Sequence, residues 1–228
     1  MKPILEVCTG NLNSVEAAVL GGARRIELCS ALSVDGLTPS YGLLETVRTR
    51  FPWLTVHVLI RPREGDFVYG EDEVRLMERD IKALLPMADA IVGGALTVDG
   101  RIDIETTRRL IDASDGKPFT FHRAFDHCAD APTALRQLID LGCHRVLTSG
   151  QQPTAEQGIP LLRRLTEQAA GQIIILPGGG VTSCNARHIL EQTGTTEIHA
   201  SASRPAAHAI KQTSAAEVSA ILQAIGER

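Results

Sequence analysis

The chain has 228 residues and a formal net charge of -4, with 43% hydrophobic and 22% charged residues, which are ordinary values for a soluble globular protein. This near-neutral balance disfavours a nucleic-acid binder, and no apolar run of about 18 residues predicts a transmembrane helix. The N-terminus lacks the pattern of a signal peptide. The five cysteines contain no CxxC pair. We therefore expect reduced thiols in a cytoplasmic protein rather than a disulfide framework or a zinc ribbon.

Short apolar runs recur along the chain and alternate with amphipathic segments. Runs that are apolar on both faces are typical of parallel strands covered by helices. The predicted strands are 4–8, 25–29, 54–60, 90–92, 119–122, 145–148, 173–176 and 197–200. The predicted helices are 15–20, 43–50, 73–85, 104–113, 131–141, 155–169, 186–192 and 215–225. A doubly wound open sheet also alternates in this way, but eight β/α units in about 230 residues predict a single-domain (β/α)₈ TIM barrel over residues 1–228.

Charged residues recur at strand positions that can face the interior of such a barrel. They are Glu6, Glu27, His57, Arg61, His122 and His199. Barrels of this kind keep their active sites at the C-terminal ends of the strands, so these residues are candidates for acid–base chemistry. Charges inside a barrel are costly unless they are paired, and mutual neutralisation of Glu6, Glu27 and Arg61 explains them equally well.

Three consecutive glycines, Gly178, Gly179 and Gly180, follow the seventh predicted strand and lead toward a helix. Backbone N–H groups at a helix start bind anions, and barrels frequently hold phosphate with the loops after strands seven and eight. Ser201 belongs to the second of these loops. The segment predicts an anion or phosphate site, and the alternative is that the glycines only make a tight turn.

His122, Arg123 and Asp126 lie together after the fifth predicted strand. A histidine can act as a general acid or base near neutral pH, and an arginine can clamp an anion. A hydrogen-bonded structural histidine explains His122 equally well. His199 follows Glu197 by two residues, so both side chains can face the same way, and we expect a functional role for His199.

Cys8 and Cys29 end the first two predicted strands within a repeated pattern of apolar residue, Glu, apolar residue and Cys. Neighbouring strands are about 4.8 Å apart, so sulfur atoms at matched positions can approach each other. Two thiolates can hold a soft ion such as Cu(I), with a histidine as an optional third ligand. A buried cysteine is also a common small apolar side chain, so both interpretations stay open.

Several short motifs, taken together and in order, resemble the copper homeostasis protein CutC family. They include LEVC (5–8), RIELC (25–29), GLTPS (36–40), TFHRAFD (120–126), PGGG (177–180) and EIHAS (197–201). The resemblance runs over roughly residues 3–203. It implies a (β/α)₈ barrel, a cytoplasmic protein that forms homo-oligomers, and a role in copper handling with Cys8 and Cys29 as the Cu(I) ligands.

Two hypotheses of function follow. The first is a cytoplasmic copper homeostasis protein that binds Cu(I) through the two strand-end cysteines, with His199 or His122 as helper. The second is a barrel enzyme acting on a small anionic or phosphorylated metabolite. Its anion would be held by the glycines and Ser201 and clamped by Arg61 and Arg123, and its acid–base candidates are Glu6, Glu27, His122 and Asp126. A purely structural barrel is a third interpretation. We expect a homodimer or a higher homo-oligomer, with no nucleic-acid or membrane partner.

Overall fold

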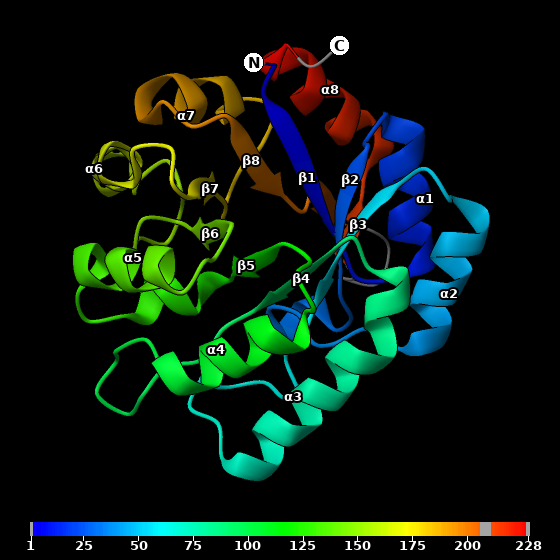
Figure 1. Ribbon diagram of the computed structural model, residues 1–228. Coiled ribbons are helices and arrows are strands. Elements are labelled where there is room, and N and C mark those ends of the chain that lie inside the picture. The colour runs from blue at the N-terminus through cyan, green and yellow to red at the C-terminus, as the bar shows by residue number, and fades with distance from the viewer. Residues whose placement is uncertain (1, 206–210, 227–228) are drawn as a thin grey trace.

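Eight parallel strands form a nearly closed barrel with eight α-helices around it in the computed structural model, which describes residues 2–205 and 211–226 (Figure 1). Each strand pairs with its neighbour in sequence, and β1 also pairs with β8. A parallel bridge between Gly178 and His199 links the end of β7 to β8. The prediction of a (β/α)₈ barrel is therefore confirmed.

The predicted strands all form, with small shifts at their ends. They are β1 (Ile4–Thr9), β2 (Arg25–Leu28), β3 (Thr55–Leu59), β4 (Ala90–Gly93), β5 (Phe119–Phe121), β6 (Arg145–Thr148), β7 (Ile174–Pro177) and β8 (Glu197–Ala200). The helices are α1 (Leu12–Gly21), α2 (Tyr41–Arg50), α3 (Glu71–Leu84), α4 (Ile104–Ala113), α5 (Ala131–Asp140), α6 (Ile159–Ala169), α7 (Ala186–Thr193) and α8 (Ala215–Ile225). Short 3₁₀ helices lie at η1 (Leu32–Val34), η2 (Leu85–Met87) and η3 (Arg123–His127).

Four helix starts, those of α1, α2, α3 and α6, differ from the prediction by two to four residues, and the two larger shifts have local reasons. Helix α1 begins at Leu12 rather than at residue 15, because the Asn11 side chain caps it by accepting a hydrogen bond of 2.9 Å from the Ser14 N–H. Helix α6 begins at Ile159 rather than at residue 155, because the preceding residues form turns after β6. The predicted alternation is correct, and only the boundaries move.

A small hairpin between β8 and α8 was not predicted from the sequence. It consists of β9 (Ser203–Pro205) and β10 (Lys211–Thr213), which pair in antiparallel fashion. The polar, alanine-containing residues of this segment lack the apolar run of a buried strand, so they gave no strand signal. The hairpin places Thr213 near β8, where its hydroxyl donates to the Ser201 carbonyl at 3.3 Å.

The main hydrophobic core lies between the barrel and the surrounding helices. It is built from outward-facing strand residues such as Val7, Ile26 and Val58 together with the buried faces of the helices. A second, small cluster of Cys8, Cys29, Leu59 and Val92 is buried separately from it. Among the described residues, no helix combines the length and apolar character needed to cross a lipid bilayer.

Candidate functional site

The register of the barrel decides which polar side chains meet. Cys8 on β1 is level with Glu27 on β2, and Glu27 is level with His57 on β3. On the other side of β1, Glu6 is level with His199 on β8. Strands in a barrel are staggered, so residues that match in the repeated sequence pattern are offset by two positions in space. The expected matching of Cys8 with Cys29 is therefore wrong in register.

The two cysteines nevertheless approach each other closely. The Cys8 and Cys29 sulfur atoms are 3.8 Å apart, and both side chains are buried. The Cys29 thiol also donates to the Thr9 carbonyl at 3.4 Å, and the Cys8 thiol donates to Glu27 Oε1 at 3.5 Å. The hydrogen bond between the sulfur atoms, together with burial, raises the pKa of the Cys8 thiol well above its usual value.

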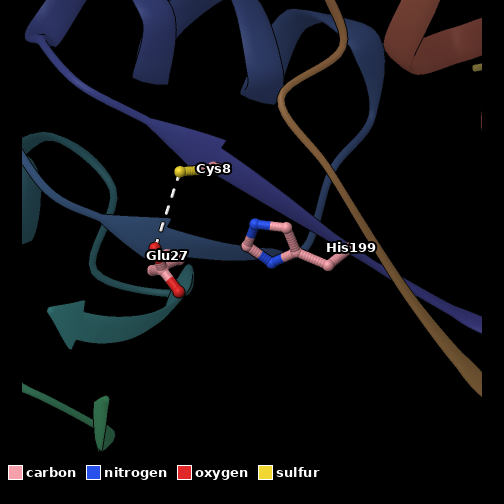
Figure 2. Close-up of side chains that lie close together, drawn as sticks. All are labelled: Cys8, Glu27 and His199. Carbon is pink, nitrogen blue, oxygen red and sulfur yellow. Dashed lines mark hydrogen bonds between the residues drawn. The ribbon is translucent and has the colours of Figure 1, made fainter. Parts of the chain in front are cut away.

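Cys8, Glu27 and His199 form a compact buried cluster (Figure 2). One ligand-type atom from each of the three residues lies within 4.8 Å of the others. The side chains come from three adjacent strands, β2, β1 and β8. Burial raises the pKa of Glu27, and its Oε2 atom has no hydrogen-bond partner within the described part of the chain. The cluster thus combines a thiol, a carboxylate and an imidazole.

Glu6 lies beneath this cluster and orients His199. The His199 Nδ1 atom is 3.0 Å from Glu6 Oε1, and Glu6 Oε2 is 2.6 Å from His57 Nδ1 and 3.1 Å from Arg25 Nε. Burial alone would raise the pKa of Glu6, but the charges and hydrogen bonds of His57 and His199 hold it well below its usual range. Burial disfavours the charged form of His199, yet hydrogen bonds with Cys8 and Glu6 raise its pKa well above the usual value.

Arg25, Arg145 and Glu197 form an ion-pair network in this interior that was not predicted from the sequence. Glu197 forms an ion pair with Arg25, and its carboxylate also accepts hydrogen bonds of 2.9 and 3.1 Å from Arg145. Burial would raise the pKa of Glu197, but the hydrogen bonds from Arg145 and Arg25 lower it. The available signal was an arginine at the start of the second and sixth predicted strands, where a purely apolar strand needs none.

Asp126 and Arg123 form a second polar group, at the loop after β5. The Asp126 carboxylate accepts hydrogen bonds from Arg123 Nε at 2.8 Å, from the Thr148 hydroxyl at 2.5 Å, and from Ser149 and Gln151 N–H groups at 3.0 and 3.2 Å. These bonds tie η3 to the loop after β6. The Asp126 carboxylate thus holds two loops together, and its acid–base role stays a prediction.

Two other candidates, Arg61 and His122, form hydrogen bonds to the backbone. The buried Arg61 guanidinium donates to the carbonyls of Val34 at 2.7 Å and of Gly36 and Gly65, both at 3.0 Å. These bonds link two loops, and an anion-clamping role for Arg61 stays a prediction. Burial lowers the pKa of His122 to about 3, and its Nδ1 atom accepts from the Ala124 N–H at 3.3 Å. A ring that is neutral near pH 7 agrees with the structural interpretation of His122, and its acid–base role stays a prediction.

In the glycine segment after β7, the first glycine, Gly178, packs closely against neighbouring strands. A Cβ atom on Gly178 would lie 2.6 Å from Leu147 Cδ1 on β6 and 3.3 Å from His199 Cβ on β8, so a larger residue would have to displace these side chains. Gly179 and Gly180 have positive φ angles of 102° and 70°. The Arg123 guanidinium lies against Gly179, with Nη1 at 3.8 Å from where a Cβ would be. The Ser201 hydroxyl is 3.0 Å from that of Ser203.

Comparisons with known proteins agree with one another. Residues 3–204 match the model of the CutC family. A family protein CutC from Bacteroides fragilis is 50% identical over 200 residues, covering 87% of this chain and 80% of that protein. The human copper homeostasis protein cutC homolog is 49% identical, covering 87% of this chain and 73% of its own length.

A solved structure agrees with the sequence relatives. The crystal structure of a copper homeostasis protein CutC from Streptococcus agalactiae has a TM-score of 0.83 and 36% identity, covering 87% of this chain and 98% of that one. The matched region contains every strand of the barrel and the Cys8, Glu27 and His199 cluster. This chain therefore belongs to the CutC family.

Proposed function

We propose that this protein acts in copper homeostasis and binds Cu(I) through Cys8 and Cys29. The observation that carries the proposal is the distance of 3.8 Å between the two sulfur atoms. Thiolates are ligands that select the soft Cu(I) ion. The relatives named for copper homeostasis support the same assignment.

The surroundings of the two thiols suit a soft ion. Leu59 and Val92 pack with the cysteines, and Leu32 lies against this group, so the sulfur atoms have an apolar lining. An apolar shell excludes water and favours the less strongly hydrated monovalent ion. Cysteine binds a metal as the thiolate. Binding of Cu(I) would therefore release the thiol protons that form the hydrogen bonds to Glu27 and to the Thr9 carbonyl. Cu(I) held here would be shielded from solvent.

The test is an anaerobic competition titration of the reduced protein against a chromogenic Cu(I) chelator. We expect the wild type to take up one Cu(I) ion per chain and the Cys8→Ser/Cys29→Ser double variant to lose this uptake. Cys143→Ser is the matched control, because Cys143 is also buried and free but lies outside the cluster. Full retention of affinity in a folded double variant would refute the proposal.

A second candidate function is that of an enzyme acting on a small anionic or phosphorylated metabolite. The observation that favours it is the Arg123 guanidinium, whose side chain is 42% exposed and lies against Gly179 at the rim of the barrel. An arginine beside a glycine turn offers both a charge and backbone N–H groups to an anion. Inorganic phosphate is the simplest probe: we expect it to shift the amide resonances of residues 178–180 in the wild type but not in Arg123→Gln. Equal shifts in both proteins would count against this site.

We further propose a cytoplasmic location and a homo-oligomeric state. All five cysteines are free thiols, as expected in a reducing compartment. Several large apolar side chains are exposed, including Trp53 at 55%, and such residues are enriched at protein interfaces. Sedimentation equilibrium over a range of protein concentrations tests the oligomer, and a monomer at every concentration would contradict it.

A further inference from the structure

We propose that Cys8, Glu27 and His199 form a binding site for a divalent cation of borderline hardness, with Zn²⁺ as the ion that best matches the donor set. The three donor atoms come from adjacent strands, lie within 4.8 Å of one another and are all buried (Figure 2). Thiolate, carboxylate and imidazole are the three side-chain ligands that Zn²⁺ takes in proteins. This site goes beyond the Cu(I) pair, since it uses Glu27 and His199 and does not need Cys29.

The spacing of the donor atoms fits a zinc ion. With Zn–S of about 2.3 Å and Zn–O of about 2.1 Å, a sulfur and an oxygen ligand of a tetrahedral zinc ion are about 3.6 Å apart. The Cys8 sulfur is 3.5 Å from Glu27 Oε1. An ion could therefore replace the thiol proton between these two atoms with little movement of either strand.

Glu6 supplies the outer carboxylate that zinc-binding histidines usually have. Its Oε1 atom is 3.0 Å from His199 Nδ1. A carboxylate that accepts from one ring nitrogen fixes the orientation of the ring, and a metal bound at the other nitrogen takes the place of its proton. That other nitrogen, Nε2, points toward Cys8 and Glu27 (Figure 2). The orientation of the ring is thus already that of a metal ligand.

The charges of the interior leave Glu27 available for a cation. Glu6 and Glu197 are each ion-paired with Arg25, and Glu197 also with Arg145. The Glu27 side chain is buried, and its Oε2 atom has no hydrogen-bond partner among the described residues. A buried carboxylate with an unpartnered oxygen is unfavourable. A divalent cation bound by one thiolate, one carboxylate and a neutral imidazole would form a site with no net charge.

The cluster supplies three ligands to an ion. Cys8, Glu27 and His199 are all buried, with 7%, 5% and 8% exposure. The Cys29 thiol is turned to the Thr9 carbonyl and is not one of the three clustered donors. Three protein ligands and an open fourth position are typical of zinc sites that bind water or a substrate, rather than of closed structural sites.

The experiment uses the reduced, full-length protein with Co²⁺ and Zn²⁺ as the only added probes. We expect one Co²⁺ per chain, with the near-ultraviolet charge-transfer band of a cobalt–thiolate bond and the visible bands of four-coordinate cobalt. Zn²⁺ should displace it. Glu27→Gln removes a direct ligand and should weaken Zn²⁺ binding by more than a factor on the order of 100, which is the upper end of what loss of an outer-shell partner costs. Cys29→Ser should leave Zn²⁺ binding unchanged.

The same variants separate this site from the Cu(I) pair. Cys29→Ser should lose tight Cu(I) binding and keep Zn²⁺, whereas Glu27→Gln should keep Cu(I) and lose Zn²⁺. Failure of the wild type to bind Co²⁺ or Zn²⁺, or Zn²⁺ binding by Glu27→Gln at wild-type strength, would overturn the divalent site while leaving the copper proposal standing. If Glu27→Gln does not fold, His199→Gln removes the imidazole ligand instead and should lose the cobalt spectrum in the same way.

Discussion

Glu6 and Glu27 occupy equivalent places in the repeated pattern of the first two strands, yet their surroundings are opposite. Glu6 contacts Arg25, His57 and His199, and its pKa is held well below the usual value against the effect of burial. Glu27 accepts a hydrogen bond from the Cys8 thiol, and burial raises its pKa. The two carboxylates are neighbours in one barrel interior.

The difference separates a structural charge from a candidate functional one. The Glu6 and Glu197 carboxylates belong to a network in which arginines neutralise them, and such a network fills the barrel at little electrostatic cost. Glu27 lies beside a thiol and an imidazole, and a cation bound between the three groups would neutralise its charge. Substitutions in the two regions should therefore have different consequences for stability.

The largest expected effect is in the paired region. Glu197→Gln leaves the partly buried Arg145 without its carboxylate and removes one partner of the buried Arg25, so we expect a loss of about 3–5 kcal/mol in the free energy of unfolding. Urea denaturation measures it. Glu45→Gln, at an exposed position of α2, is the matched control and should change stability by less than about 0.5 kcal/mol. A loss below about 1 kcal/mol in Glu197→Gln would show that the network is dispensable.

An intermediate effect on the free energy of unfolding is expected at His122, because this buried ring is neutral in the folded protein. The folded pKa of about 3 lies below the unfolded value of about 6.5, so the unfolded state binds more protons between these values and stability falls as the pH drops through that window. We expect this residue to cost the wild type about 2 kcal/mol between pH 7 and pH 5.

His122→Asn keeps an acceptor for the Ala124 N–H but removes the titrating ring. Its stability should therefore depend less steeply on pH, and urea denaturation at pH 7, 6 and 5 compares the two proteins. Parallel pH profiles would mean that His122 is protonated in the folded protein, which would restore it as an acid–base candidate.

The smallest effect is expected at Glu27 in the metal-free protein. Glu27→Gln removes a buried carboxylate that forms no ion pair with an arginine or lysine among the described residues and accepts a hydrogen bond from Cys8, so the free energy of unfolding should change by no more than about 1 kcal/mol. Denaturation in the presence of a chelator measures it. A loss as large as that of Glu197→Gln would assign Glu27 to the structural network and remove the contrast between the two carboxylates.

Much of the fold could be predicted from the sequence because each strand carries its own signal. Runs such as 90–92 and 173–176 are apolar on both faces, and eight short runs alternating with helical segments leave few architectures. Helix starts were less predictable, since the residue that caps a helix depends on which side chain reaches the first free N–H groups, as Asn11 does for α1.

The candidate site was predictable only in part. The period of two along a strand is local, so it placed Glu6 and Cys8 on one face and Glu27 and Cys29 on one face. Whether Arg61 and Asp126 are free for chemistry depends on the loops that reach them. In the structure, backbone carbonyls occupy the Arg61 guanidinium, and N–H and hydroxyl donors surround Asp126.

The sequence by itself determined the eight β/α units, their order and the set of polar residues that line the strands, because all of these follow from short-range periodicity. Only the tertiary structure decided that Cys8 lies beside Glu27, and that His199 closes the cluster from β8. The physical reason is the stagger of the barrel: closing the sheet offsets neighbouring strands, and no local pattern records the size of that offset.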